Sequence, residues 1–460
     1  MNFEKKDLSN YQHIHLIGIG GISMSAIAET LHNWNHIVTG SDLNQSEITD
    51  KLNLHGIKTS IGHDLENCKK ADLIIYSAAI KEDDPEMMIA KQNSIPLVTR
   101  GEFIGYLTKL YKESICISGT HGKTTTTSMI SLCFLKANLD PSIQVGAILD
   151  TIGGNYQVGN SDYFIVESCE YQANFLKLFP KTEVILNIDN DHLDFYKTFD
   201  NVVKAFQDFV KILEPNGLLV VNADDANCLA LKNITKSNFI SYGIENSEAT
   251  FLAKNITFDK NGFATFDVYK NREFFHRFSL SVAGNHNVLN ALACISVCHS
   301  YEIDKETLAE ALKSFTGASR RLEYKGSFND VSVFDDYGHH PTEILATVNA
   351  IKNKDFHESW VIFQPHTYSR TAAHLEAFAE SLSGFDHIIL VDIYAAREKN
   401  TIGISSQDLA DKMETLGKEV IYIKDFEEVV TYIKSNAKPH DLVLTLGAGT
   451  VTEIGPMLTK

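Results

Sequence analysis

The chain has 460 residues, which at about 150 residues per domain predicts roughly three domains and excludes a small single module. Hydrophobic residues make up 44% of the chain and charged residues 22%, so neither a disordered chain nor a coiled coil describes it. The formal net charge is -18 and no segment concentrates basic residues, which argues against nucleic acid as a partner.

The seven cysteines are scattered and contain no C-x-x-C pair, a pattern that favours reduced thiols in a cytosol. Residues 1–18 lack the apolar core of a secretory signal, and no apolar run approaches the ~20 residues needed to cross a bilayer. We therefore expect a cytoplasmic protein without membrane insertion, present as a monomer or a homodimer.

Short apolar runs bounded by Gly, Asn, Asp and Ser alternate with helix-length segments along the whole chain, which predicts α/β domains with parallel sheets. The predicted domains cover residues 1–109, 110–317 and 318–460. Strands are expected, in chain order, at 13–18, 36–40, 72–78, 114–119, 162–167, 183–188, 217–222, 332–338, 359–365, 387–394 and 441–449. Alternating β-like sequence fills 249–281, and helices are expected at 286–299 and 305–315.

The first glycine cluster, Gly18-Ile19-Gly20-Gly21, follows a predicted strand and precedes a helix. Free backbone N–H groups and the helix dipole suit a pyrophosphate at such a turn. Ser23 stands where the dinucleotide fingerprint has its third glycine, while Asp42 ends the next strand, where an acidic ribose ligand is expected. The cluster therefore predicts a diphosphate-containing ligand, with a merely tight strand-to-helix turn as the alternative.

The second cluster, Gly119-Thr120-His121-Gly122-Lys123-Thr124, also lies between a predicted strand and a helix. In a nucleotide-triphosphate loop the amides hold the phosphates, the lysine neutralises them and the threonine hydroxyl binds Mg²⁺. Ile117 stands where the full Walker motif has its first glycine. We therefore interpret the cluster as a shortened relative of that loop, with a chance match in a surface turn as the alternative.

Two further residues follow predicted strands of the second block: Glu167 ends 162–167, and His192 follows 183–188. Ligands of α/β proteins bind at the carboxyl ends of strands. A carboxylate and a neutral imidazole there could hold a second divalent cation that bridges phosphate oxygens. Taken singly, each residue has the alternative of a hydrogen-bonded surface role, and Glu170 competes with Glu167 for the same function.

The remaining polar motifs lie further along the chain. AGNHNVLNALA at 283–293 places amides and a histidine before a helix, and SRRLEYKG at 319–326 offers Arg320 and Arg321 in a loop. Arginine suits a transferring phosphoryl group because its fork spans two oxygens and stays charged, although an arginine pair on a solvated surface is the common alternative.

Three segments of the third block, at 334–344, 363–371 and 392–399, each follow a predicted strand. Their aromatic, imidazole and guanidinium groups predict a binding lip at one sheet edge, although any single histidine there can equally be noncatalytic. His339 and His340 lack partners at zinc-ligand spacing, so we predict no zinc site.

The order of motifs resembles the ATP-dependent Mur ligases of bacterial peptidoglycan synthesis over about residues 13–455: GIGG, GTHGKTTT, VESCEY, NIDNDH, AGNHNVLNALA, RRLE, DDYGHHPTE, FQPHTYSRT and GAGT. DDYGHHPTE and FQPHTYSRT point to the branch that adds L-alanine to UDP-N-acetylmuramate and to its near relatives. Sister ligases carry a carbamylated lysine at the position that corresponds to residues 205–207. This chain has no lysine at 205–207, although Lys204 is adjacent.

The resemblance implies three α/β domains: a Rossmann-like domain that binds the UDP-sugar, a central P-loop-type ATPase domain with a mixed sheet, and a Rossmann-like domain that binds the amino acid. It also implies that the carboxylate of UDP-N-acetylmuramate attacks the γ-phosphate of ATP, and that the amine of L-alanine displaces the resulting acyl phosphate. Two Mg²⁺ sites are implied. The amine must also lose a proton, which a histidine of near-neutral pKa could accept, and His192 and His366 are both candidates.

Residue roles also follow from the resemblance. The catalytic residues implied are Lys123, His192, Arg321 and His366. The ATP-binding residues implied are Gly119, Thr120, His121, Gly122, Lys123, Thr124, Thr125, Asn285, His286, Arg321, Tyr337 and His339. The residues implied to contact the UDP-sugar are Gly18, Ile19, Gly20, Gly21, Asp42 and Ser77. The amino acid would contact His366 and Arg370, and the metals would be bound by Thr124, Glu167 and His192.

Three other functions stay open. A recycling ligase of the same family would attach a preformed tripeptide to the same UDP-sugar acid. An NAD-dependent oxidoreductase would use the first glycine turn but leaves GTHGKTTT without a role. A nonenzymatic ATP-regulated module would have little use for a second metal site.

Overall fold

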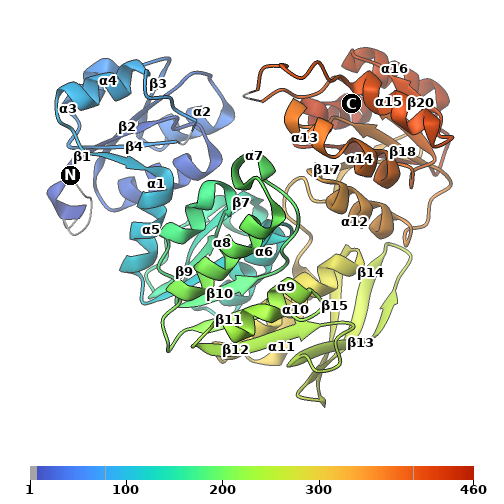
Figure 1. Cartoon of the computed structure of the whole chain (residues 1–460), viewed down its shortest axis with the longest axis horizontal. Coiled ribbons are helices and arrows are strands. Elements are labelled where there is room, and N and C mark those ends of the chain that lie inside the picture. Colours follow the sequence, from blue (N-terminus) through green and yellow to red (C-terminus); the bar gives the residue numbers. More distant parts are fainter. Residues whose placement is uncertain (1–7, 78, 397) are drawn as a thin grey trace. The chain divides into compact units, whose positions relative to one another are not determined.

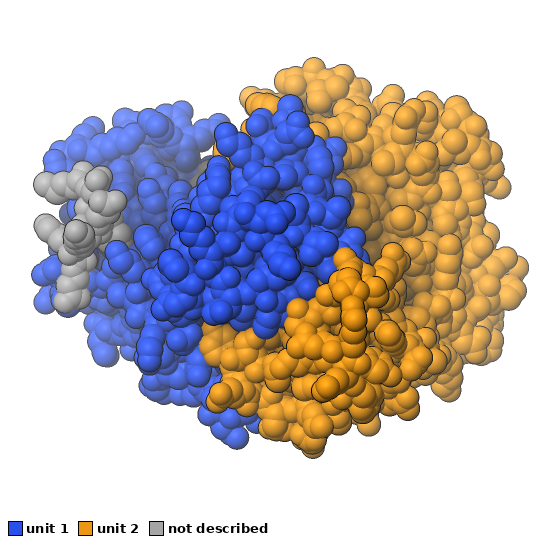
Figure 2. Space-filling model, turned by 60° about the horizontal axis from the view of Figure 1, so that its bottom comes forward, with its two compact units in different colours: residues 1–190, 198–241 blue, residues 191–197, 242–460 orange. Residues whose placement is uncertain are grey.

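The computed structural model describes residues 8–77, 79–396 and 398–460. Its strands form three sheets, which follow one another along the chain with helices between their strands (Figure 1). The chain divides into two compact units: unit 1 holds residues 1–190 and 198–241, and unit 2 holds residues 191–197 and 242–460 (Figure 2).

Unit 1 begins with a five-stranded parallel sheet in the order β3-β2-β1-β4-β5. Its strands are β1 (His13–Ile17), β2 (Ile37–Asp42), β3 (Lys58–Ile61), β4 (Leu73–Tyr76) and β5 (Leu97–Thr99). Its helices are α1 (Ile22–Asn33), α2 (Glu47–Leu54), α3 (Leu65–Lys70), α4 (Pro85–Gln92) and α5 (Arg100–Leu110). The strand order reverses at β1. In α/β sheets, ligands bind at such a reversal, beside the carboxyl ends of the strands.

The rest of unit 1 is built around β6 (Glu113–Ser118), whose apolar residues Ile115 and Ile117 are fully buried. Parallel partners lie on both sides of it: β9 (Tyr163–Glu167) on one side and β10 (Thr182–Ile185) on the other. The loops that follow β6, β9 and β10 therefore open at the same sheet edge.

The remaining elements of this part extend the sheet and cover it. The strands are β7 (Ser142–Leu149), β8 (Gly154–Gln157), β11 (Leu218–Asn222) and β12 (Asn238–Gly243). The helices include α6 (Lys123–Lys136), α8 (Phe199–Ile212) and α9 (Ala226–Ala230), with the 3₁₀ segment η3 (Tyr171–Lys177). The strand order is β12-β11-β10-β6-β9-β7-β8, and β7 pairs antiparallel with β8, so the sheet is mixed.

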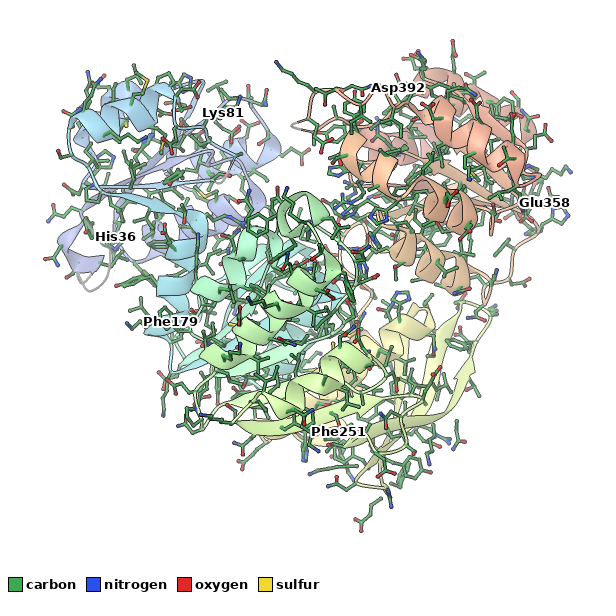
Figure 3. All side chains as sticks on the ribbon, viewed as in Figure 1. His36, Lys81, Phe179, Phe251, Glu358 and Asp392 are labelled. Atoms are coloured by element: carbon green, nitrogen blue, oxygen red, sulfur yellow. The ribbon has the colours of Figure 1, made fainter. Side chains whose placement is uncertain are left out.

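Unit 2 starts with an antiparallel ribbon of β13 (Phe251–Phe258), β14 (Phe263–Lys270) and β15 (Glu273–Ala283), joined in the order β15-β14-β13-β12. Phe251 lies on β13 (Figure 3), and its side chain is fully buried. The helices of this part are α7 (Leu193–Tyr196), α10 (Asn285–Ser300) and α11 (Lys305–Ser314). Burial alternates from Phe278 to Val282 of β15, which explains the alternating β-like sequence there.

The third sheet has the order β16-β17-β21-β18-β19-β20 and is parallel except for β16 against β17. Its strands are β16 (Glu323–Phe328), β17 (Val331–Asp336), β18 (Ser359–Phe363), β19 (His387–Leu390), β20 (Val420–Tyr422) and β21 (Leu442–Leu446). Its helices are α12 (Pro341–Ile351), α13 (Tyr368–Ala373), α14 (Leu375–Leu382), α15 (Ser406–Thr415), α16 (Phe426–Asn436) and α17 (Ile454–Thr459).

Both faces of the third sheet are apolar, because alternate residues of β18 enter two different core clusters. Val361 and Phe363 belong to one cluster, and Trp360 and Ile362 belong to the other. Burial on both faces produces the nearly continuous apolar runs from which these strands were predicted.

The described residues include no helix that combines the length and the apolar character needed to span a membrane. All seven cysteines are free thiols, and six of them are buried. Most of these thiols therefore pack as small hydrophobic side chains.

Candidate functional site

The loop between β6 and α6 requires glycine at both of its glycine positions. Gly119 has a φ of 140° and Gly122 a φ of 84°, which residues with a side chain rarely adopt. A Cβ on Gly119 would also lie 3.0 Å from the Cβ of Leu186. Gly122 precedes the first residue of the 14-residue helix α6 and brings no capping side chain. The first N–H groups of α6 are therefore suited to an anion.

The loop that follows β10 holds the loop between β6 and α6 in place. The Asn187 amide accepts a hydrogen bond from the N–H of His121 at 2.8 Å and donates one to its carbonyl oxygen at 3.0 Å. The N–H of Asp189 donates to the Thr120 hydroxyl at 2.9 Å, and the Asp189 carboxylate lies 3.0 Å from Nε2 of His121. Our sequence analysis missed Asn187 and Asp189, although both lie in the NIDNDH motif directly after a strand.

Lys123, the first residue of α6, is held by its own loop and by a carboxylate. Its Nζ donates to the carbonyl oxygens of Gly119 and Thr120, and it lies 3.0 and 2.9 Å from the two oxygens of Glu170. Burial alone would lower the pKa of Lys123, but Glu170, Cys169 and Glu167 together raise the pKa above its ordinary value. The lysine is therefore fully charged at neutral pH.

Thr124 and Glu167 form a pair of oxygen ligands beside the phosphate loop. The Thr124 hydroxyl donates to Oε2 of Glu167 at 3.0 Å, and the N–H of Gly146 donates to the same oxygen at 2.8 Å. A Cβ on Gly146 would lie 2.6 Å from that oxygen, so glycine is needed there to leave the carboxylate in place. A hydroxyl and a carboxylate are hard oxygen donors, and this set fits Mg²⁺.

The first glycine turn lies at the carboxyl ends of β1, β2 and β4. The Asp42 carboxylate accepts hydrogen bonds from the N–H of Gly20 at 2.9 Å and of Asn44 at 3.2 Å, so it binds the turn itself. A Cβ on Gly18 would lie 3.3 Å from the Cβ of Ser77. The Ile19 side chain is fully buried, so any ligand contact of this residue would come from its backbone.

In unit 2 the structure brings together the aromatic and imidazole residues predicted at the carboxyl edge of the third sheet. Tyr337 and His339 follow β17, while His366 follows β18. The His339 ring lies 5.3 Å from the Tyr337 ring and 5.5 Å from the His366 ring. The Arg321 guanidinium lies 5.3 Å from the centre of the Tyr337 ring.

Burial dominates the electrostatics of this cluster. It lowers the pKa of His339 to about 3, and burial together with the charge of Arg370 lowers the pKa of His366 to about 4. Burial, followed by the charge of Arg321, lowers the pKa of His286 to about 4. All three imidazoles are therefore neutral at pH 7. His366 can accept a proton, but it is a weak base in this state.

Arg370, on α13, connects this cluster with the segment that precedes α7. Its Nη2 lies 3.1 Å from Oδ1 of Asp191, and its Nη1 lies 3.2 Å from Nδ1 of His366. Burial raises the pKa of Asp191, but the Arg370 guanidinium, the neighbouring histidines and the N–H of His192 together hold the pKa below its usual range. Asp191 was not among the residues we predicted. It positions the guanidinium that we predicted for the amino acid.

His192 follows Asp191 in an unusual backbone conformation, with a φ of 57° at the position that precedes α7. A left-handed residue other than glycine is uncommon and marks a backbone held by its surroundings. Glu167 belongs to unit 1 and His192 to unit 2. The assignment of both residues to one second metal stays a prediction.

Asn285 and His286 differ from expectation in one respect. We expected them before the helix, whereas Asn285 is the first residue of α10. Gly284 precedes it with a φ of 101°, and a Cβ there would lie 2.6 Å from Cε1 of His286. Glycine therefore leaves room for the imidazole at the start of the helix.

Three family models match successive parts of the chain. They are described as the Mur ligase family catalytic domain, at residues 13–112, the Mur ligase middle domain, at 117–298, and the Mur ligase glutamate ligase domain, at 320–449. The chain belongs to the Mur ligase family. The predicted family and its three-domain α/β fold are thus confirmed, while the exact domain boundaries stay predictions.

Particular relatives are similar over their whole length. A protein of Acetivibrio thermocellus named UDP-N-acetylmuramate--L-alanine ligase is 46% identical, over 99% of this chain and 97% of its own. One of the same name from Clostridium acetobutylicum is 47% identical over 99% of both chains. The crystal structure of UDP-N-acetylmuramate-alanine ligase MurC from Thermotoga maritima matches with a TM-score of 0.83 and 28% identity, covering 97% of this chain and 98% of its own.

Proposed function

We propose that this chain joins L-alanine to the carboxylate of UDP-N-acetylmuramate and converts ATP to ADP and phosphate, as a step of peptidoglycan synthesis. The observation that carries the proposal is 46–47% identity over almost the entire chain to relatives that bear that name. The lysine-bearing phosphate loop supports the use of ATP independently of those names, because its two glycines and the start of α6 suit a triphosphate.

The chemistry must first overcome repulsion, since a carboxylate and a triphosphate are both anions. Lys123 and the N–H groups at the start of α6 would bind the phosphates, and Arg321 would contact the γ-phosphate. Thr124 and Glu167 would hold a divalent cation, which when bound supplies further positive charge to the phosphate oxygens. Support comes from the hydrogen bond between the Thr124 hydroxyl and Glu167.

The amino-acid side of the reaction needs a cation for the carboxylate of L-alanine and an acceptor for its amine proton. Arg370 would bind the carboxylate, since Asp191 orients its guanidinium. His366 lies beside Arg370 and is neutral, so it could take the proton. His192 is the other candidate for that role. The UDP-sugar would bind at the first glycine turn, near Asp42 and Ser77.

A ligation assay with four acceptors tests the proposal. UDP-N-acetylmuramate and ATP with Mg²⁺ are offered together with L-alanine, L-serine, glycine or the recycling tripeptide, and phosphate release and the ligated product are measured. We expect L-alanine to be the best acceptor.

Two outcomes would contradict the proposal. Activity confined to the tripeptide would identify a recycling ligase. No phosphate release with any acceptor would favour a nonenzymatic nucleotide-binding module. Titration with NADH provides a separate check, because tight NADH binding would support the oxidoreductase alternative.

A further inference from the structure

The ammonium group of Lys123 is saturated in this structure. A lysine ammonium has three N–H donors and no acceptor. Its partners are the carbonyl oxygens of Gly119 and Thr120 and the carboxylate of Glu170. A phosphate can therefore gain a hydrogen bond from Lys123 only if one of these partners releases it.

Glu170 is the partner that can leave. The two carbonyl groups belong to a loop fixed by the backbone of Gly119 and by the hydrogen bonds of Asn187 and Asp189. Glu170 reaches Lys123 through a side chain with rotatable bonds, and it comes from the segment after β9, 47 residues away. Its carboxylate is also an anion, as the incoming phosphate is.

We propose that Glu170 takes the place of a nucleotide phosphate on Lys123 in the nucleotide-free protein, and that it thereby makes nucleotide binding depend on a divalent cation. The Glu170 side chain is only 3% exposed, so releasing it separates a buried carboxylate from the Lys123 ammonium. Such a charge is strongly unfavourable. Glu167 adds a second negative charge close to Lys123, as its effect on the pKa of Lys123 indicates.

The metal dependence follows from counting charges. A metal-free triphosphate takes Lys123 from Glu170 and adds its own negative charge to two carboxylates. A metal-loaded nucleotide brings two positive charges into the same region, which compensate the released Glu170. Glu170 is thus a selectivity residue that disfavours nucleotide without its metal.

Isothermal titration with a nonhydrolysable ATP analogue, in Mg²⁺ and in EDTA, tests this inference with the full-length protein. The wild-type protein should bind the analogue well in Mg²⁺ and weakly in EDTA. Glu170→Gln removes the competing charge and keeps the shape. We expect it to tighten binding in EDTA by about tenfold or more, the scale of one charge-assisted hydrogen bond, with a smaller change in Mg²⁺.

Glu183→Gln is the matched control, because Glu183 is a buried glutamate of the neighbouring strand β10 and, among the described residues, its carboxylate has no hydrogen-bond partner. It should leave the ratio of the two affinities unchanged. Weaker binding of Glu170→Gln in both conditions would mean that Glu170 assists the bound nucleotide, and it would overturn the proposal. An unchanged ratio would overturn it too.

Glu170→Asp keeps the charge but withdraws it by one methylene, and it decides the question if thermal melting shows that the glutamine variant does not fold. We expect a smaller gain in metal-free binding, in the same direction, and no gain would contradict the proposal. The inference rests on the ATP part of the proposed function. If the wild-type protein does not bind the analogue even in Mg²⁺, the ATP assignment itself fails, which is a different result.

Discussion

The two glycine turns of unit 1 share a local design but differ in the charges around them. Each follows a strand of a parallel sheet and leads into a helix, α1 in the first case and α6 in the second. In the first turn the Asp42 carboxylate accepts the N–H of Gly20. In the second, Lys123 occupies the first position of the helix and binds Glu170.

The comparison teaches that a glycine turn selects backbone shape, whereas its neighbours select the ligand. Small residues permit close approach of any anion. A carboxylate at the turn suits hydroxyl groups, such as those of a ribose, and a lysine suits a high phosphate charge. We therefore expect variants of the two turns to affect different substrates, and this separation can be tested.

Lys123→Ala should have the largest effect. Removing a charge that contacts the transferring group is expected to slow turnover by about 10²- to 10³-fold or more, as for the loss of a main transition-state contact. Binding of UDP-N-acetylmuramate should persist, because the first turn is untouched. Phosphate release and isothermal titration measure the two effects. Lys136→Ala, at the exposed end of the same helix, is the control.

An unchanged rate of phosphate release in Lys123→Ala would remove the ATP assignment of the second turn. Loss of UDP-N-acetylmuramate binding together with activity would instead show that the two turns do not act separately. Thermal melting must accompany both measurements, since the variant leaves Glu170 buried without its lysine.

Asp42→Ala is the reciprocal variant and should act on the other substrate. The carboxylate accepts the N–H of Gly20 in the first turn and that of Asn44 after β2, and the sequence predicted it as a ligand of the ribose. Loss of hydrogen bonds to a charged group predicts about 10- to 100-fold weaker binding of UDP-N-acetylmuramate. Affinity for the ATP analogue should stay within about twofold of the wild-type value.

Titration of both ligands distinguishes these effects, with Asp50→Ala as the control for an exposed aspartate of the next helix, α2. Equal weakening of both ligands in Asp42→Ala would mean that the variant disturbs the fold of unit 1 rather than one turn. The separation of the two turns would then be wrong.

Asp191→Asn extends the comparison to unit 2, where a carboxylate holds an arginine as Glu170 holds a lysine. The Asp191 carboxylate orients Arg370, and an amide would hold the guanidinium more weakly. We expect the KM for L-alanine to rise by about tenfold, the scale of one such contact, with a smaller change in the KM for ATP. Steady-state kinetics measure both constants.

Asp208→Asn is the control for that variant, because Asp208 forms a partly exposed pair with Lys211 on α8. A fall in kcat with an unchanged KM for L-alanine would contradict the positioning role of Asp191. It would place the residue among the groups that act in the transition state instead.

Sequence patterns predicted the parts of the candidate site that depend on neighbours along the chain. A strand followed by Gly119 and Lys123, or by Gly18 and Gly20, is a local pattern, and both turns form where we expected them. Buried parallel strands produced equally local apolar runs. This is why the α/β fold and buried strands such as β1, β6 and β18 could be predicted. The sequence analysis missed β3, β5, β7, β8, β12, β16 and β20.

The contacts between side chains that lie far apart in the sequence could not be predicted in the same way. Glu170 was considered only as a competitor of Glu167 for metal, yet it binds Lys123 while Glu167 binds Thr124. The choice depends on β9 lying beside β6, which no local pattern specifies. Arg370 and Asp191 are 179 residues apart, so their contact requires the folded unit.

Substitution of Glu183 should have the smallest effect, and it compares a second buried carboxylate with that of Glu170. Glu170 has a lysine partner, whereas Glu183 on β10 is fully buried and, within the described residues, neither of its oxygens has a hydrogen-bond partner. Burial therefore raises the pKa of Glu183 well above its ordinary value. Glu183→Leu should raise the melting temperature at pH 7 to 8 without changing catalytic rates, because the polar group loses its cost of about 1–3 kcal/mol.

The pH dependence of that gain has a definite sign. Above the pKa that Glu183 has in the unfolded chain, the folded protein keeps a proton that the unfolded chain has released, so stability falls as pH rises toward the folded pKa. Glu183→Gln cannot titrate and should lack this part of the decline, so its melting temperature should gain on the wild type between about pH 5 and 8. Parallel melting curves across that range would mean that the carboxyl group finds a partner or water, and the contrast with Glu170 would disappear.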